Sequence, residues 1–169
     1  MPEKRKVAEG VKFEYEGVLD FTPFMRGVVQ FLTDRGYGVK ESGYSEVVKP
    51  DHKEFAVEFT ADKKATNNTE LVIVVAIDVE EFKDVVVEMD GKDRKLQTAK
   101  VSVNMGATIK SDIEGKWEGK PWRNLFKNIY EKYVVGDVMD QFQKTVVQDM
   151  KDLKYELKKN LNMFRTEKE

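Results

Sequence analysis

The chain contains a single histidine and no cysteine, and these two counts decide most of the chemistry that its side chains could perform. Without thiols there is no disulfide, no thiolate nucleophile and no thiolate metal ligand. His52 would have to act alone in any serine triad or imidazole metal site, and the sequence has no zinc-binding helix motif, nucleophile elbow or phosphate-binding glycine loop. We therefore interpret His52, in the turn sequence Pro50-Asp51-His52, as a solvated turn residue. We expect no catalytic residue, no metal site and no cofactor.

Carboxylates are the other groups that could support chemistry. Their spacing does not match a calcium-binding loop, which needs a glycine and a terminal glutamate at fixed positions. A weak Ca²⁺ or Mg²⁺ site and an electrostatic contact for a basic partner are alternatives, but an acidic edge that discourages strand-to-strand association is the favoured interpretation. The cluster comprises Asp78, Glu80, Glu81, Asp84, Glu88, Asp90 and Asp93.

Two tryptophans, Trp117 and Trp122, flank a Lys-Pro pair. We expect their rings to cover a junction between sheet and helix, and the alternative is an aromatic rim at a ligand mouth or a protein contact. Lysines and arginines surround them, a combination that can bind nucleic acid. Acidic residues interrupt this basic run and the net charge is −2, so we expect no nucleic-acid binding.

Hydrophobic periodicity predicts the elements that position these residues. Residues 11–16 alternate apolar and charged side chains, as a half-buried strand does. A helix follows, which Thr22 could cap and Gly36 could end. From residue 38 to about 113 the period is two, which predicts several strands, with a hairpin turn at Asp90-Gly91. Phe59, Ile73, Val75 and Val103 are predicted to be buried.

After Gly115 the pattern becomes helical, with a kink expected at Gly136-Asp137. These elements predict an α+β fold: an antiparallel sheet of about five to six strands, one N-terminal helix, and a long, kinked C-terminal helix packed on the sheet. Residues 1–169 are expected to form a single domain, with charged, frayed tails at 1–10 and 165–169.

One apolar stripe continues along the C-terminal helix as far as Phe164. Residues 137–164 would span about 42 Å as a helix, whereas strands of about ten residues span about 33 Å. We therefore expect the last two turns to reach beyond the sheet and contact a protein partner or a second copy of the chain. The candidate contact residues, including the two tryptophans, are Leu157, Leu161, Phe164, Trp117 and Trp122.

The order strand, helix, antiparallel strands, C-terminal helix resembles that of the helix-grip domains, the START and plant-allergen type, over about residues 11–164. The resemblance implies an apolar cavity between the sheet and the last helix, and hence a carrier of a lipid or other apolar small molecule. The segments 35–46 and 117–135 also resemble uncharacterised small archaeal proteins, a resemblance that implies no activity. The candidate cavity residues are Phe55, Val57, Phe59, Val101, Val103, Met105, Met139, Phe142 and Val146.

Composition limits the class of protein. Hydrophobic residues make up 40% of the chain and charged residues 36%, as in a folded domain with a charged surface. The start of the sequence lacks the apolar core of a secretory signal, and no stretch approaches the roughly 18 apolar residues of a membrane span. We expect a cytoplasmic, non-enzymatic binding or assembly module that acts through its surface and its long C-terminal helix. The alternative is the carrier implied by the helix-grip resemblance.

Overall fold

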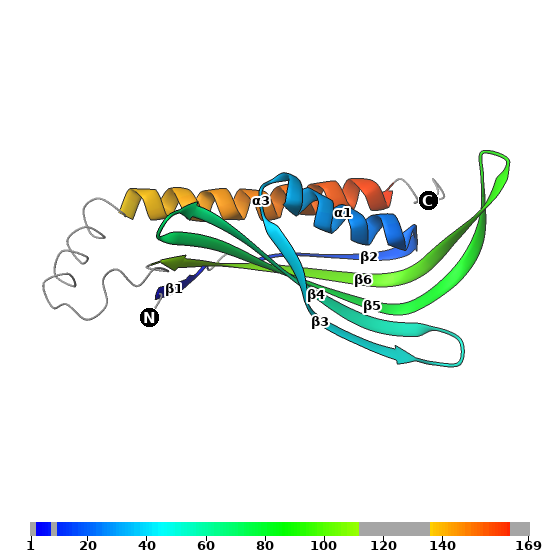
Figure 1. Cartoon of the computed structure of the whole chain (residues 1–169). Helices are drawn as coiled ribbons and strands as arrows, with labels where there is room; N and C mark the ends of the chain where they lie inside the picture. The colour runs from blue at the N-terminus through cyan, green and yellow to red at the C-terminus, as the bar shows by residue number, and fades with distance from the viewer. Residues whose placement is uncertain (1–2, 8–9, 112–135, 163–169) are drawn as a thin grey trace, which may run out of the picture.

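The structure is a computed structural model that describes residues 3–7, 10–111 and 136–162. These residues form an α+β fold with six strands and two helices (Figure 1). In chain order the elements are β1 (Glu3–Lys6), β2 (Val11–Leu19), α1 (Phe21–Asp34), β3 (Gly38–Val48), β4 (Lys53–Thr66), β5 (Thr69–Met89), β6 (Lys92–Ser111) and α3 (Gly136–Asn162).

All the strand pairings are antiparallel, and the sheet has the order β1-β6-β5-β4-β3. Strand β2 pairs with β6 further along the edge that β1 also occupies. The predicted hairpin at Asp90-Gly91 is confirmed, and both residues have positive φ, 52° and 75°. This conformation suits the right-handed twist of the two strands that the turn connects.

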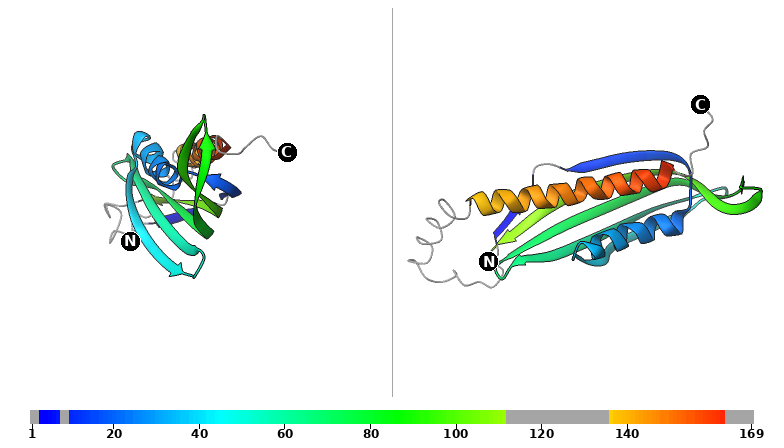
Figure 2. Two further views of the ribbon diagram at one scale, coloured as in Figure 1. Left: turned by 90° about the vertical axis from the view of Figure 1, so that its right-hand side faces the viewer. Right: turned by 90° about the horizontal axis from the view of Figure 1, so that it is seen from above.

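Both helices cover the same face of the sheet (Figures 1 and 2). The alternation expected for residues 11–16 is confirmed, because Val11, Phe13 and Tyr15 are buried while the charged residues between them are exposed. The predicted core residues are also buried, with Phe59 8% exposed and Ile73, Val75 and Val103 fully covered. The opposite face of the sheet, which carries the alternate side chains, has no helix of the described residues on it.

A β-bulge in β5 changes which side chains face the helices. Glu81 has φ of 52°, and the pairing with β6 shifts between Glu80 and Lys83. The extra residue turns Phe82 toward the helix-covered face, where its ring lies 5.1 Å from Phe21 and 5.2 Å from Phe55. The period-two pattern of the sequence could not predict this change of face.

Helix α1 begins earlier than the sequence indicated. Its first residue is Phe21, so Asp20 rather than Thr22 occupies the N-cap position. Asp20 makes no side-chain capping bond, and the amide of Phe21 instead donates to the side-chain oxygen of Gln97 on β6, at 3.0 Å. Gly36 follows the end of the helix with φ of 88°, as predicted.

The prediction that Leu157 and Leu161 contact a partner is wrong. They are 1% and 2% exposed, buried in the core of this chain. The length argument failed because β5 has 21 residues and β6 has 20. At 3.3 Å per residue these strands are about 70 and 66 Å long, so the sheet is longer than the C-terminal helix. Strands of this length arise because the predicted central strand and the first arm of the hairpin are one continuous strand, β5.

Two further predictions concern the terminal elements of the chain. Residues 3–6, predicted to fray, form β1 and pair with residues 108–111 of β6. The described C-terminal helix α3 runs from Gly136 to Asn162 and has 27 residues, and the part of the predicted helical region between residues 115 and 135 lies outside the described residues. The expected kink involves residues before Gly136, which lie outside the described residues. No helix in the described part of the chain is long and apolar enough to cross a membrane.

Candidate functional site

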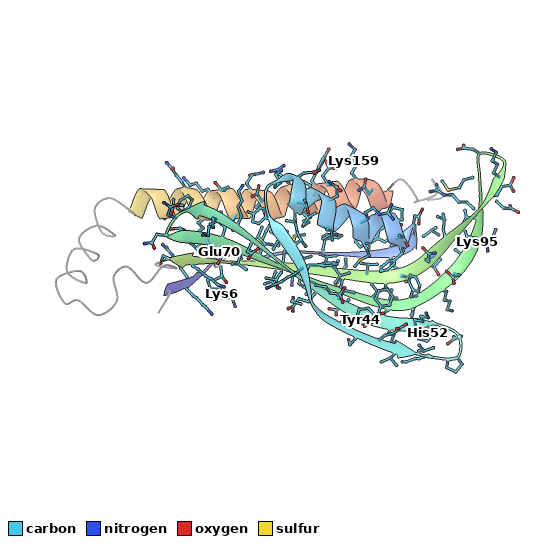
Figure 3. The ribbon with its side chains drawn as sticks, viewed as in Figure 1. Lys6, Tyr44, His52, Glu70, Lys95 and Lys159 are labelled. Atoms are coloured by element: carbon cyan, nitrogen blue, oxygen red, sulfur yellow. The ribbon has the colours of Figure 1, made fainter. Side chains whose placement is uncertain are left out.

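The face of the sheet opposite the helices, which we call the open face, contains a hollow of about 700 Å³. Strands β2, β3, β4, β5 and β6 all contribute residues to it, and it opens to solvent. The hollow lies toward the β3–β4 turn, the end of the sheet at which Figure 3 labels Tyr44 and His52. Its charged lining residues are Glu14, Glu16, Glu54, Asp78, Glu80 and Lys100.

Strand register brings these residues together from distant parts of the sequence. Glu14 pairs with Ser102 of β6, Ser102 pairs with Asp78 of β5, and Asp78 pairs with Ala56 of β4. In the next row, Glu16 pairs with Lys100, which pairs with Glu80. Side chains in paired positions of one face lie about 5 Å apart, so these rows concentrate the carboxylates in one area.

Four of the carboxylates are unneutralised within the described structure. Glu14, Glu16, Asp78 and Glu80 are exposed, and their side-chain carboxylates make no hydrogen bond or ion pair with another described residue. The neighbouring Lys100 instead pairs with Glu81 on the bulge, at 3.7 Å. The acidic area therefore keeps its negative charge available for an external cation.

His52 lies at the edge of this area and is more covered than predicted. Its side chain is 18% exposed rather than fully solvated, because it is held between two carboxylates. Nδ1 lies 2.6 Å from Asp51 Oδ1, and Nε2 lies 3.6 Å from Glu54 Oε1. The hydrogen bond with His52 lowers the pKa of Asp51, and Lys49, at 3.0 Å, lowers the pKa of Glu54. These pairs hold the β3–β4 turn.

The predicted apolar cavity residues belong to the packed core. Val57, Phe59, Val101, Val103, Met105 and Val146 are buried, while Phe55 and Phe142 are partly buried against the same core. Of the predicted set, Phe55 and Val101 also contribute to the lining of the hollow, which lies on the other face of the sheet. The side chains of Met139, Trp117, Trp122 and Phe164 lie outside the described residues.

The predicted acidic cluster is divided by the structure. Asp78 and Glu80 line the hollow, whereas the other five carboxylates lie on the bulge or along the projecting β5–β6 hairpin. No group of histidine, aspartate and glutamate side chains among the described residues could hold a metal ion. Sequence reasoning missed Glu14 and Glu16 as members of the acidic area; their outward position was visible in the alternation, but their neighbours depend on register.

A second polar cluster is buried between the helices. Tyr37 donates a hydrogen bond to Asp149 Oδ2 at 2.7 Å, and Arg35 donates to Asp149 Oδ1 at 2.9 Å. Burial, and then the hydrogen bond to Asp149, raises the pKa of Tyr37, so its hydroxyl is a donor and not a nucleophile. Sequence reasoning did not find this cluster. Its geometry is that of a structural connection between the end of α1 and α3.

Comparison with known proteins does not assign a family. No protein-family model matches this chain, and no curated protein matches it significantly in sequence. The function must therefore be inferred from the open face itself.

Proposed function

We propose that this protein is a non-enzymatic binding module and that the acidic part of its open face binds a basic surface of a protein. One observation carries the proposal: Glu14, Glu16, Asp78 and Glu80 share one hollow and have no ion-pair partner among the described residues. Complementary charge across an interface raises association rates and selects partners. The proposed binding surface is therefore on the sheet, and not on the C-terminal helix as the sequence had led us to expect.

The shape of the site supports the same function. The hollow is concave, several strands wide and open, so a lysine- or arginine-bearing segment can enter without any rearrangement of the sheet. An antiparallel sheet is rigid over this distance, so the carboxylates are held in place before a partner arrives. The chain's one imidazole is hydrogen-bonded to Asp51 and lies beside Glu54, which favours a structural role for it rather than acid–base catalysis.

A lysine-rich peptide labelled with a fluorophore is a direct probe of this function. Its binding, followed by fluorescence anisotropy, should weaken about tenfold in the double variant Asp78→Asn/Glu80→Gln, which corresponds to about 1.4 kcal/mol. Raising the salt concentration should have the same effect, since exposed charges are screened.

A matched control removes the same number of charges elsewhere. Glu88 and Asp93 face each other on the β5–β6 hairpin, away from the hollow, and both are exposed. Glu88→Gln/Asp93→Asn should bind the peptide as the wild type does. Equal weakening in both double variants would show that the peptide responds to net charge alone. The hollow would then not be the site that binds basic surfaces.

A further inference from the structure

Strand β2 has one edge without a partner strand. It pairs with β6 along all nine of its residues, and no other strand of the described residues pairs with it. Seen from the side of the helices, β2 runs along the outer side of α3 (Figure 2). In an antiparallel pair the backbone groups of alternate residues point to each side, so about half of the amides and carbonyls of β2 face outward. These groups are available to a further strand.

The other long edges of the sheet are less suited to pairing. Strand β3 has a bulge between Glu41 and Gly43, and bulges are a common protection of edge strands. The part of β5 beyond Phe82 pairs with β6 alone, and a two-stranded ribbon is only marginally stable by itself. Strand β2 pairs without a register shift, and its apolar side chains are buried in the core. It is therefore the regular, firmly held edge.

A second copy of β2 can pair with this edge only in certain registers. Two identical antiparallel strands are related by a two-fold axis perpendicular to the sheet, and each contact across the axis is made twice. Side chains that lie directly opposite each other share one face, and the faces alternate along a strand. The axis must therefore pass through a residue of β2, and not between two residues.

The register centred on Phe13 makes the charges of the two copies complementary. Lys12 of each copy then lies opposite Glu14 of the other on the open face, and Val11 lies opposite Tyr15 on the helix-covered face. Lys12 and Glu14 are exposed, and neither has an ion-pair partner in the part of the chain that the structure describes. Opposite charges in facing positions stabilise a strand pair, and this pairing breaks no ion pair of the monomer.

The alternative registers lack this complementarity. An axis at Lys12, Glu14 or Glu16 places that charged residue opposite its own copy, and an axis at Tyr15 places Glu14 opposite Glu16. Like charges in facing positions are destabilising. An axis at Val11, or beyond Glu16, brings no two charged residues of β2 together. Within β2 the Phe13 register is therefore the one that pairs opposite charges without also pairing like charges.

We propose that β2 is the interface of a two-fold symmetric dimer, in which the sheets of two copies join edge to edge with Phe13 at the axis. Because the axis is perpendicular to the sheet, the open faces of both copies lie on the same side. Glu14 lines the hollow, so Lys12 of the second copy supplies a cation at its border. Two acidic hollows then flank the joined edge, and a partner with two basic segments would contact both.

The dimer should be reversible. From residue 10 to residue 16 the paired segment is about 24 Å long at 3.4 Å per residue. An interface of one strand pair is small, and small interfaces are typical of transient complexes. Sedimentation velocity over a range of protein concentrations would measure the monomer–dimer equilibrium, and circular dichroism would verify the fold of each variant.

Two charge reversals test the register. Lys12→Glu makes the net charge more negative and Glu14→Lys makes it less negative, yet each places like charges opposite each other twice. Each should therefore dimerise about tenfold more weakly than the wild type. The double variant Lys12→Glu/Glu14→Lys restores opposite charges at both positions and should dimerise as the wild type does. An equimolar mixture of the two single variants should also restore the dimer.

Two matched controls carry the same changes of charge at positions without a charged residue opposite. Glu16 faces Gly10 in the proposed register, so Glu16→Lys should weaken the dimer much less than Glu14→Lys does. Lys40 is exposed on the other edge strand, β3, and Lys40→Glu should leave the dimer unchanged. A dimer that is insensitive to both reversals of β2, or that the double variant does not restore, would overturn the inference.

The outcome is separate from that of the proposed function. A wild-type protein that is monomeric at every concentration, yet binds the lysine-rich peptide through Asp78 and Glu80, would overturn the dimer and leave the binding module standing. A dimer that follows the charge swap at Lys12 and Glu14, but binds no peptide, would support the interface and contradict the binding module.

Discussion

The hydroxyl of Tyr37 and a carboxylate oxygen of Asp149 lie 2.7 Å apart although 112 residues separate them in the chain. Tyr37 is 2% exposed and Asp149 is 5% exposed, so the hydrogen bond is shielded from water. Arg35 neutralises the other carboxylate oxygen and also reaches Asp152 at 3.1 Å. The cluster therefore fixes α3 against the end of α1, on the side of the sheet away from the hollow.

Removing the buried carboxylate should destabilise the fold. Asp149→Ala leaves the Tyr37 hydroxyl buried without an acceptor, which should cost about 1–3 kcal/mol in the free energy of unfolding measured with urea. The control is Asp152→Ala, which removes a partner of Arg35 whose side chain is 34% exposed and should cost less than about 1 kcal/mol. Equal losses in the two variants would contradict the structural role of the buried pair.

Stability should fall at alkaline pH through Tyr37. Burial raises its pKa above the ordinary value of 10.0, so the folded protein keeps the hydroxyl protonated where the unfolded chain ionises it. The stabilisation is fully present below pH 10 and is lost as the pH rises above it. Unfolding measured between pH 8 and 11 should show a weaker pH dependence in Tyr37→Phe than in the wild type. Identical pH profiles would show that Tyr37 is not shielded in solution.

The core prediction concerns Phe59, which is 8% exposed on the helix-covered face. Phe59→Ala should reduce the free energy of unfolding by about 3–5 kcal/mol, the range for loss of a packed phenylalanine. Tyr44→Ala, at a neighbouring strand position that is 58% exposed, should change it by less than about 1 kcal/mol. A loss below about 1 kcal/mol for Phe59→Ala would mean that this strand face is not packed in solution.

Two glycines of the first helix region should respond oppositely to alanine. Gly36 has φ of 88°, a conformation that costs an L-residue about 1–2 kcal/mol, so Gly36→Ala should destabilise the protein. Gly27 lies inside α1, where a Cβ atom would come no closer than 3.9 Å to Asn160, so Gly27→Ala should stabilise it by up to about 1 kcal/mol. Thermal unfolding of both variants would measure the two signs, and shifts in the same direction would contradict the assigned end of the helix.

Binding to duplex DNA or RNA should be undetectable at physiological salt, because the net charge is −2 and the hollow is acidic. An electrophoretic mobility assay with random-sequence duplexes would measure it. Micromolar binding that weakens steeply with salt would contradict this prediction, because such a salt dependence reports contacts with phosphates.

Local sequence patterns were sufficient wherever a few neighbouring residues decide the structure. The alternation of Val11, Phe13 and Tyr15 predicted a half-buried strand, Gly36 predicted the end of a helix, and Asp90-Gly91 predicted a hairpin turn. Each depends on backbone preference or on a short period, and both are properties of the chain within a few residues.

The tertiary structure alone decided which residues meet and which face of the sheet is covered. Leu157 and Leu161 have an apolar pattern that fits either a core or a partner contact, and only the length of β5 and β6 places them in the core. The bulge at Glu81 reverses which side chains face the helices, and strand register brings Glu14 into one row with Asp78 across β6. These outcomes depend on pairings between residues that are far apart in the chain. The free energy of the whole packed sheet selects those pairings, so a local sequence pattern cannot predict them.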